Sequence, residues 1–335
     1  MSWKTALYNY VHHRNQLDME YSVESVLPFV SDHNYLNKEA DRLRRKCAMD
    51  QARGITPTKK ETRLSVQRFA EREDQVTADI KLVCSTVGVQ AQQELSEQRV
   101  EWERITLRPE EDGWDIVRIE PLQTERSLIT LPSDGGLLQA DEAFHATAPM
   151  RLPSSPLLNP QVQPWAPRAR YNRAAAVAYA DAWWDKGNPD YITFEVDCTN
   201  FVSQCLYAGG AAMNYTGRRD SGWWYKGRFG GQEHWSYSWA VANSLLYYLL
   251  RSRTGLRAEE VNSPEQLELG DVICYDWNGD GTFQHNTIIT AKDANGMPLV
   301  NAHTTNSKHR FWSYRDSPSW SERTQYRFLH IVESM

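Results

Sequence analysis

The chain has 335 residues, of which 41% are hydrophobic and 24% are charged, so its composition can fill a buried core and argues against general disorder. Its formal net charge is −6. An acidic balance excludes the typical nucleic-acid-binding protein, which presents a basic face to the phosphate backbone. The length favours two domains.

The N-terminal residues 1–13 contain neither the apolar core of a signal peptide nor a small-residue cleavage site. We therefore predict a cytoplasmic location for the chain as given, and a secreted or cell-wall-associated one if a leader was removed. No run approaches the ~20 apolar residues of a membrane helix, so no membrane span is expected.

The chain has five cysteines, an odd number, and their spacing is not that of metal ligands. This predicts reduced thiols and no bound metal, and we expect no other cofactor. The cysteines are Cys47, Cys84, Cys198, Cys205 and Cys274.

Residues 1–121 are predicted to form a small α+β domain. The apolar spacing over residues 3–48 is helical, and Gly54 then acts as a stop. Residues 76–84 alternate between apolar and polar as in a half-buried strand, and the Asp-Gly pair at 112–113 predicts a hairpin turn. In architecture this order resembles cystatin-like and nuclear-transport-factor-like cones. The domain shows no catalytic cluster, so we expect a positioning or partner-binding role.

Residues 122–167 are predicted to be a linker or strap, because prolines recur there without any periodic apolar pattern. These prolines are Pro149, Pro153, Pro156, Pro160, Pro164 and Pro167.

Residues 168–335 are predicted to form a second α+β domain, in which helices come first and an antiparallel sheet follows. That order is expected of a papain-like catalytic domain. The predicted helices cover residues 174–184, a segment after Asp197, and residues 241–251; the predicted strands cover residues 271–275, 285–291, 298–303 and 327–332.

Cys198 is the candidate nucleophile of this domain. The apolar residues after it recur at helical spacing and Asp197 is a suitable N-cap, so Cys198 should lie in the first turn of a helix. There the helix dipole and the N–H groups would lower the pKa of the thiol and could hold an oxyanion. The alternative is a small buried apolar residue, which is the role expected of Cys205.

His285 is the candidate base, at the start of a predicted strand. The following strand returns after a turn, and because residues of equal parity share a face in a hairpin, Asn301 or His303 is expected to approach His285. Either could hold the imidazole in the tautomer that accepts a thiol proton. The alternative is a surface histidine at a strand end.

Five segments resemble the putative amidase domain family of bacilli and clostridia, itself similar to the NlpC-type and CHAP-type cell-wall peptidases. The resemblance covers about residues 168–333. The segments are Tyr171-Asn172-Arg173-Ala174-Ala175-Ala176, Asp197-Cys198-Thr199-Asn200-Phe201-Val202-Ser203-Gln204, Gly209-Gly210, Gly270-Asp271-Val272-Ile273 and Gln284-His285-Asn286.

The resemblance implies catalytic roles for Cys198 as nucleophile and His285 as base. It also implies a third polar residue just before an alanine on the next strand, which points to Asn301, with His303 as the second choice. The implied substrate is an amide bond, in peptidoglycan stem peptides.

Two weaker signals come from the residues between these motifs. Trp223, Trp224 and Trp239 are candidate substrate-binding residues of a lid or groove wall, or else they form a satellite core under a long loop. Residues 276–281 fit the first half of a calcium loop, but the twelfth position is Thr287 rather than Glu, so an acidic turn is the competing interpretation.

These observations predict a cysteine amidase or peptidase that acts on a peptide or peptidoglycan-type substrate through an acyl-enzyme, without a cofactor. Two alternatives remain open: an acyl transferase, and a non-catalytic glycan- or peptide-binding protein with a relic site.

Overall fold

The computed structural model describes residues 2–111, 113–126, 170–230 and 232–333. Contacts divide them into two compact units. The first lies within Met1–Thr124, Asp293–Asn295 and Ser313–Trp320, and the second within Glu125–Lys292, Gly296–Trp312 and Ser321–Met335. The predicted linker over residues 122–167 lies outside the described residues from position 127 onward. The α+β class is confirmed, because helices and antiparallel strands make up the structure.

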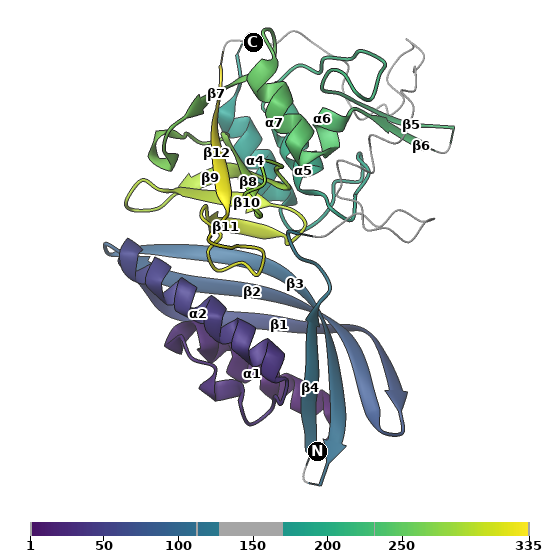
Figure 1. Cartoon of the computed structure of the whole chain (residues 1–335), viewed down its shortest axis with the longest axis vertical. Helices are drawn as coiled ribbons and strands as arrows, with labels where there is room; N and C mark the ends of the chain where they lie inside the picture. Colours follow the sequence, from purple (N-terminus) through teal and green to yellow (C-terminus); the bar gives the residue numbers. More distant parts are fainter. Residues whose placement is uncertain (1, 112, 127–169, 231, 334–335) are drawn as a thin grey trace. The chain divides into compact units, whose positions relative to one another are not determined.

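The first unit consists of helices followed by a four-stranded antiparallel meander, β1-β2-β3-β4 (Figure 1). Its elements are α1 (Trp3–Glu20), η1 (Glu24–Val26), α2 (His33–Arg53), β1 (Ile55–Arg72), β2 (Gln75–Gln90), β3 (Gln93–Glu110) and β4 (Gly113–Pro121). The predicted hairpin at residues 112–113 is confirmed, since β3 and β4 pair from Glu110 and Gly113 onward.

Local sequence explains where the two long helices begin and end. The side chain of Ser2 accepts the N–H of Thr5 at the start of α1, and Asp32 accepts the N–H of Tyr35 at the start of α2. Gly54 ends α2 with a φ of 70°, a left-handed conformation that glycine adopts without steric cost.

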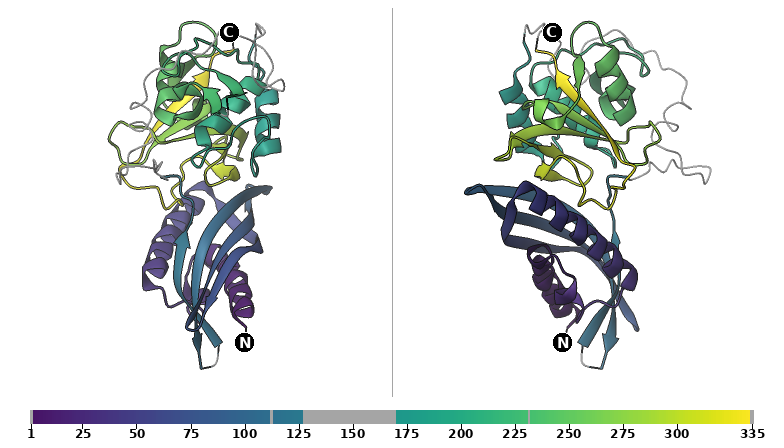
Figure 2. Two further views of the ribbon diagram at one scale, coloured as in Figure 1. Left: turned by 90° about the vertical axis from the view of Figure 1, so that its right-hand side faces the viewer. Right: turned by 60° about the vertical axis from the view of Figure 1, so that its left-hand side comes forward.

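The core of the first unit lies between the helices and one face of the curved sheet (Figure 2). The predicted alternation of β2 is confirmed: every second residue is buried against the helices. The buried residues of β2 in this core are Val76, Ala78, Ile80, Leu82 and Cys84.

The second unit places helices before an antiparallel sheet of strand order β11-β10-β9-β8-β12-β7, with a separate β5–β6 hairpin. Among the described residues, no helix has the length and apolar character that crossing a bilayer requires. The elements are α4 (Arg173–Trp183), α5 (Cys198–Ala208), β5 (Tyr225–Phe229), β6 (Gln232–Trp235), α6 (Tyr237–Ala240), α7 (Ala242–Arg251), β7 (Ala258–Val261), η2 (Pro264–Gln266), β8 (Val272–Asp276), β9 (His285–Lys292), β10 (Pro298–Ala302), β11 (Ser307–Phe311) and β12 (Gln325–Ile331).

Three of the family-like segments meet where α4 begins. The ring of Tyr171 packs so closely on Gly209 that a Cβ there would come within 2.4 Å of it, and its hydroxyl donates to the carbonyl of Gly270. Arg173 forms a 2.6 Å ion pair with the fully buried Asp271. These contacts hold α4 against the sheet of the second unit, so they have a structural role.

Candidate active site

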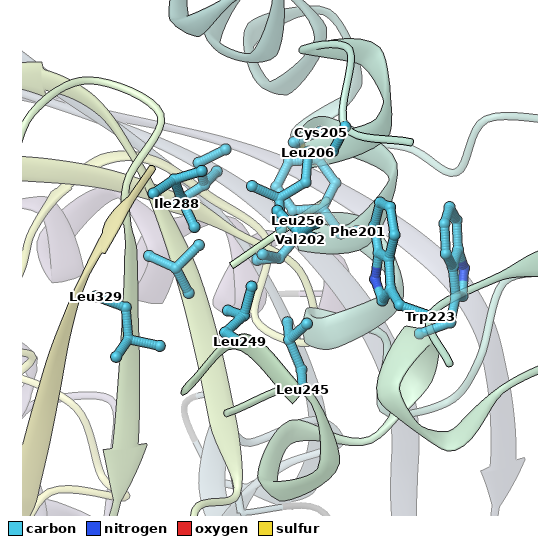
Figure 3. Close-up of a cluster of buried hydrophobic side chains, with 14 of the residues drawn as sticks. Phe201, Val202, Cys205, Leu206, Trp223, Leu245, Leu249, Leu256, Ile288 and Leu329 are labelled. Atoms are coloured by element: carbon cyan, nitrogen blue, oxygen red, sulfur yellow. The ribbon is translucent and has the colours of Figure 1, made fainter. Parts of the chain in front are cut away.

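Cys198 is the first residue of α5, so the predicted helix start is confirmed. Asp197 occupies the N-cap position, and its carbonyl accepts the N–H of Phe201. The apolar side of α5 faces the sheet, as Figure 3 shows for Phe201 and Val202 near Ile288. Burial of this side fixes the rotation of the helix and therefore the position of the cysteine at its start.

The carboxylate of Asp197 does not cap the helix, contrary to expectation. It accepts instead from the backbone N–H of Phe194, from the side-chain amide of Asn200, and from Nδ1 of His303 at 2.7 Å. Because these groups draw it away, no side chain caps the first N–H groups of α5, and the positive end of the helix dipole remains beside Cys198.

The sulfur of Cys198 lies against the backbone on both sides of His285. Its Sγ is 3.9 Å from the carbonyl oxygen of Gln284, and the backbone N–H of Asn286 donates to it. The hydroxyl of Thr199 is a third polar neighbour, with Oγ1 at 3.7 Å from Sγ.

The pKa of Cys198 is raised, whereas the position at a helix start led us to expect a lowered pKa. Burial is the largest cause, since the residue is 1% exposed, and the N–H of Asn286 and the hydroxyl of Thr199 oppose it. Cys198 is therefore a thiol at neutral pH, held among groups that favour its ionised form.

His285 is the first residue of β9, and its imidazole is completely buried. It contacts the rings of Tyr275 and Trp277, with centroids 5.4 and 5.7 Å away. Burial lowers its pKa to about 4, because a dry site disfavours the imidazolium ion. The ring is therefore neutral near pH 7 and can accept a proton.

Side chains of β9 alternate between the two faces of the sheet. His285 shares the face on which Thr287 bonds to Tyr275, whereas Asn286 lies on the face of α5 and donates to Thr199. Among the described residues, Sγ of Cys198 bonds to Thr199, Gln284 and Asn286 and makes no hydrogen bond to the imidazole of His285. The structure thus brings the sulfur to the backbone of His285 but leaves the ring on the far side of the strand.

Asn301 does not share the face of His285, contrary to the parity argument. Opposite Leu299 and Val300, β9 carries one extra residue, Thr290, and this bulge shifts the register by one so that Asn301 pairs with Ile288. Ile288 lies three residues, about 10 Å, along β9 from His285.

The amide of Asn301 is also engaged elsewhere. Its oxygen accepts from the hydroxyl of Thr290 at 2.7 Å and from the N–H of His309, and its nitrogen donates to Asp181 at 2.9 Å. These bonds connect α4, β9, β10 and β11, which is a structural role.

His303 is held at the start of α5 rather than at His285. Its Nδ1 is 2.7 Å from the carboxylate of Asp197 and its Nε2 is 2.7 Å from the carbonyl of Trp183, while the ring stacks on Phe201. Both ring nitrogens of His303 are therefore engaged with oxygen atoms, one of Asp197 and one of Trp183. Neither nitrogen of His303 is then available to accept the proton of Cys198.

The three candidate substrate-binding tryptophans are fully buried members of the core. The indole N–H of Trp223 donates to Ser203, that of Trp224 to the carbonyl of Ser221, and that of Trp239 to Asn200. They belong to the main core of the second unit, together with Phe201 and Ile288, and their buried rings line no exposed wall.

The acidic turn after β8 uses the carboxylate of Asp276 internally. This side chain is fully buried and accepts the backbone N–H groups of Asn278, Gly279 and Gly281. Its oxygens are thereby taken up by the turn, which supports the acidic-turn interpretation. Within the described ranges, no group of three or more His, Cys, Asp or Glu residues is arranged to hold a metal ion.

Sequence analysis missed a buried ion pair next to His285. Glu125 and Arg310 lie 2.7 Å apart, each side chain 2% exposed, and both interact electrostatically with His285. Glu125 fell within the predicted linker, and no pattern singled it out. A polar Lys-His-Arg run within β11 (Ser307–Phe311) was the available signal for Arg310.

We expect Arg310→Met to lower the free energy of unfolding by about 3–5 kcal/mol, because it leaves the carboxylate of Glu125 buried without its cation. Burial alone would raise the pKa of Glu125, but Arg310 lowers it. A carboxyl group with a lowered pKa in the folded state stabilises the fold at pH values above its pKa in the unfolded chain, and this stabilisation is lost as the pH falls. The loss of unfolding free energy caused by Arg310→Met should therefore be smaller in acid. Urea unfolding at pH 7 and pH 4 measures both.

The matched control is Arg327→Met, because Arg327 forms an equally short pair with Glu260 but is 48% exposed. Its expected cost is about 0–1 kcal/mol. Equal costs for the two variants would contradict the role given to burial.

Comparison with known proteins identifies most of the second unit. Residues 170–329 match the family model described as "Putative amidase domain". This segment belongs to that amidase family. The resemblance inferred from its motifs is confirmed, and the description of the family suggests amide hydrolysis in the broad sense.

Two relatives from Bacillus subtilis (strain 168) are similar to parts of the chain. "Uncharacterized protein YhbB" is 53% identical over 164 residues, which cover 49% of this chain and 51% of the relative. "Uncharacterized protein YjcM" is 31% identical over 145 residues, covering 41% of this chain and 31% of the relative. The chain therefore matches about half of the first relative's length and about a third of the second's.

A solved structure, "Crystal structure of intermembrane space region of chloroplast protein ARC6", covers 36% of this chain and 97% of its own. It is 16% identical, with a TM-score of 0.27.

Proposed function

We propose that residues 168–333 form a papain-like thiol amidase in which Cys198 is the nucleophile and His285 the base. The observation that carries the proposal is the position of Sγ at the uncapped start of α5, where it accepts the N–H of Asn286, the residue that follows His285. Membership of the amidase family supports amide hydrolysis as the reaction.

The proposed reaction begins when the thiol of Cys198 gives its proton to His285 and the sulfur attacks the amide carbonyl. N–H groups at the start of α5 stabilise the oxyanion. The imidazolium then protonates the leaving amine as the C–N bond breaks, which leaves a thioester on the enzyme. Water attacks this thioester with His285 as base and releases a carboxylic acid and the thiol.

His285 is preferred as the base because its ring is neutral, whereas both ring nitrogens of His303 face acceptors. The ring lies on the Tyr275 side of β9 in this structure, so proton transfer from Cys198 requires a rearrangement of the start of β9 and not only a change of side-chain rotamer. Catalytic hydrogen bonds commonly tighten only when substrate is bound, so the proposal assigns this rearrangement to substrate binding.

We propose amide bonds of peptidoglycan stem peptides as the substrate, on the strength of the resemblance to cell-wall peptidases. We also propose that residues 1–121 are a separate cone-like domain that positions the amidase or binds a partner. The proposal leaves Asn301, Trp223, Trp224 and Trp239 outside the catalytic machinery, because hydrogen bonds and core packing already account for them.

The test is incubation of the protein with purified bacterial cell wall in H₂¹⁸O, followed by mass spectrometry of the released peptides. A hydrolase adds one ¹⁸O atom to each new carboxylate. A new amide without ¹⁸O would identify an acyl transferase. Binding to the wall with no cleaved amide would overturn the enzymatic proposal in favour of a binding protein.

A further inference from the structure

The sulfur of Cys198 is surrounded by more hydrogen-bond donors than a resting thiol needs. The N–H of Asn286, the N–H of Thr199 and the hydroxyl of Thr199 all favour its ionised form. A thiol is a weak acceptor, whereas an anion makes charge-assisted hydrogen bonds of roughly twice the strength of neutral ones. The arrangement therefore matches a thiolate better than the thiol.

The direction of the Thr199 hydroxyl follows from the side chain of Asn286. The amide nitrogen of Asn286 lies 3.5 Å from the carbonyl of Ala242, which can only accept, and this orients the amide. The same nitrogen donates to Oγ1 of Thr199 at 3.1 Å. The oxygen of Thr199 is thus an acceptor for Asn286, and its own proton is left for Sγ of Cys198, 3.7 Å away.

All three side chains are enclosed by protein. Cys198 and Thr199 are 1% exposed and Asn286 is fully buried. The hydrogen bonds from Asn286 to Thr199 and from Thr199 to Cys198, which we call the relay, are therefore shielded from bulk water. The side-chain oxygen of Asn286 has no hydrogen-bond partner among the described residues. An amide held in this orientation with its oxygen unsatisfied indicates that donation toward Thr199 sets its position.

We propose that Thr199 donates its hydroxyl proton to Sγ of Cys198, that Asn286 acts through Thr199 to fix the direction of this hydrogen bond, and that the pair selects the thiolate. Thr199 contacts the reacting atom, and Asn286 is a positioning residue. The role of the relay in catalysis rests on the proposed function, whereas its effect on the ionisation of the Cys198 thiol does not.

The test uses Thr199→Val, which keeps the shape of the side chain but removes the hydroxyl, with Thr199→Ser as the rescue. The readout is the rate of iodoacetamide alkylation of Cys198 between pH 7 and 9, followed by peptide mass spectrometry. Below the pKa this rate is proportional to the thiolate fraction. We expect about a tenfold loss in Thr199→Val, the effect of one charge-assisted hydrogen bond, and recovery to within about twofold in Thr199→Ser.

Cys274, also buried and close to Cys198, serves as the internal control. The alkylation rate of Cys274 should be the same in wild type and in Thr199→Val. A faster rate at both cysteines would instead indicate that the substitution opens the fold locally. An unchanged Cys198 rate in Thr199→Val, or a loss that Thr199→Ser does not restore, would overturn the proposal.

A second variant tests the path through Thr199. We expect Asn286→Leu to slow alkylation of Cys198 on its own but to add nothing in the Thr199→Val background. Additive effects would show that Asn286 does not act through Thr199. Because no substrate is used, these results stand apart from the proposed function, which fails independently if Cys198→Ala retains amide hydrolysis.

Discussion

Replacement of Cys198 by alanine is expected to lower the rate of amide hydrolysis by about 10⁴-fold or more, since it removes the sulfur that forms the proposed thioester. The substitution removes one sulfur atom at the start of α5 and leaves the apolar side of the helix intact. Initial rates on the peptide identified from cell wall measure the effect. Retention of the thermal midpoint would show that chemistry, not folding, is lost.

Cys205→Ala is the matched control. Cys205 lies seven residues later on the same helix, fully buried in the core. Its substitution leaves a small cavity and should cost about 1 kcal/mol of stability but less than a twofold change in rate. If the two variants lose activity equally, Cys198 is not the nucleophile.

His285→Gln is expected to reduce the rate by about 10²- to 10⁴-fold, the usual contribution of a positioned general base. Glutamine can occupy the site beside Tyr275 and Trp277 but cannot accept the thiol proton. A thioester that accumulates in the variant, seen as a mass increase on Cys198, would show that His285 is needed more for deacylation than for attack.

The matched control is His309→Asn, which replaces a histidine outside the proposed catalytic pair. Asparagine is chosen because His309 has a φ of 54° and asparagine tolerates that left-handed conformation. We expect this variant to keep its activity. Full activity of His285→Gln would assign the base to another group and would remove His285 from the mechanism.

His285 should also make the fold sensitive to acid. Its pKa is lowered from 6.5 to about 4 by burial, so between these values the unfolded chain binds more protons than the folded one. Stability therefore falls as pH drops from about 6.5 to about 4, by an amount on the order of 3 kcal/mol. His285→Gln should lose less stability than wild type between pH 7 and pH 4.5 in urea unfolding, and an equal loss would contradict the burial argument.

Local patterns in the sequence determined where the elements begin. Helical spacing after Asp197 predicted a helix start at Cys198, and alternation predicted β2. These features depend on neighbours within a few residues, which a sequence displays directly. The polar strand β11 and the short β5–β6 hairpin carried no such pattern and were missed.

The tertiary structure alone decided which of these residues meet. One bulge in β9, opposite β10, places Asn301 on the opposite face from His285, and long-range bonds to His303 turn the carboxylate of Asp197 away from the helix it was expected to cap. Packing buries the three tryptophans and brings Glu125 to Arg310. Register, burial and ion pairing arise between segments far apart in the chain, so the spacing of residues along it cannot encode them.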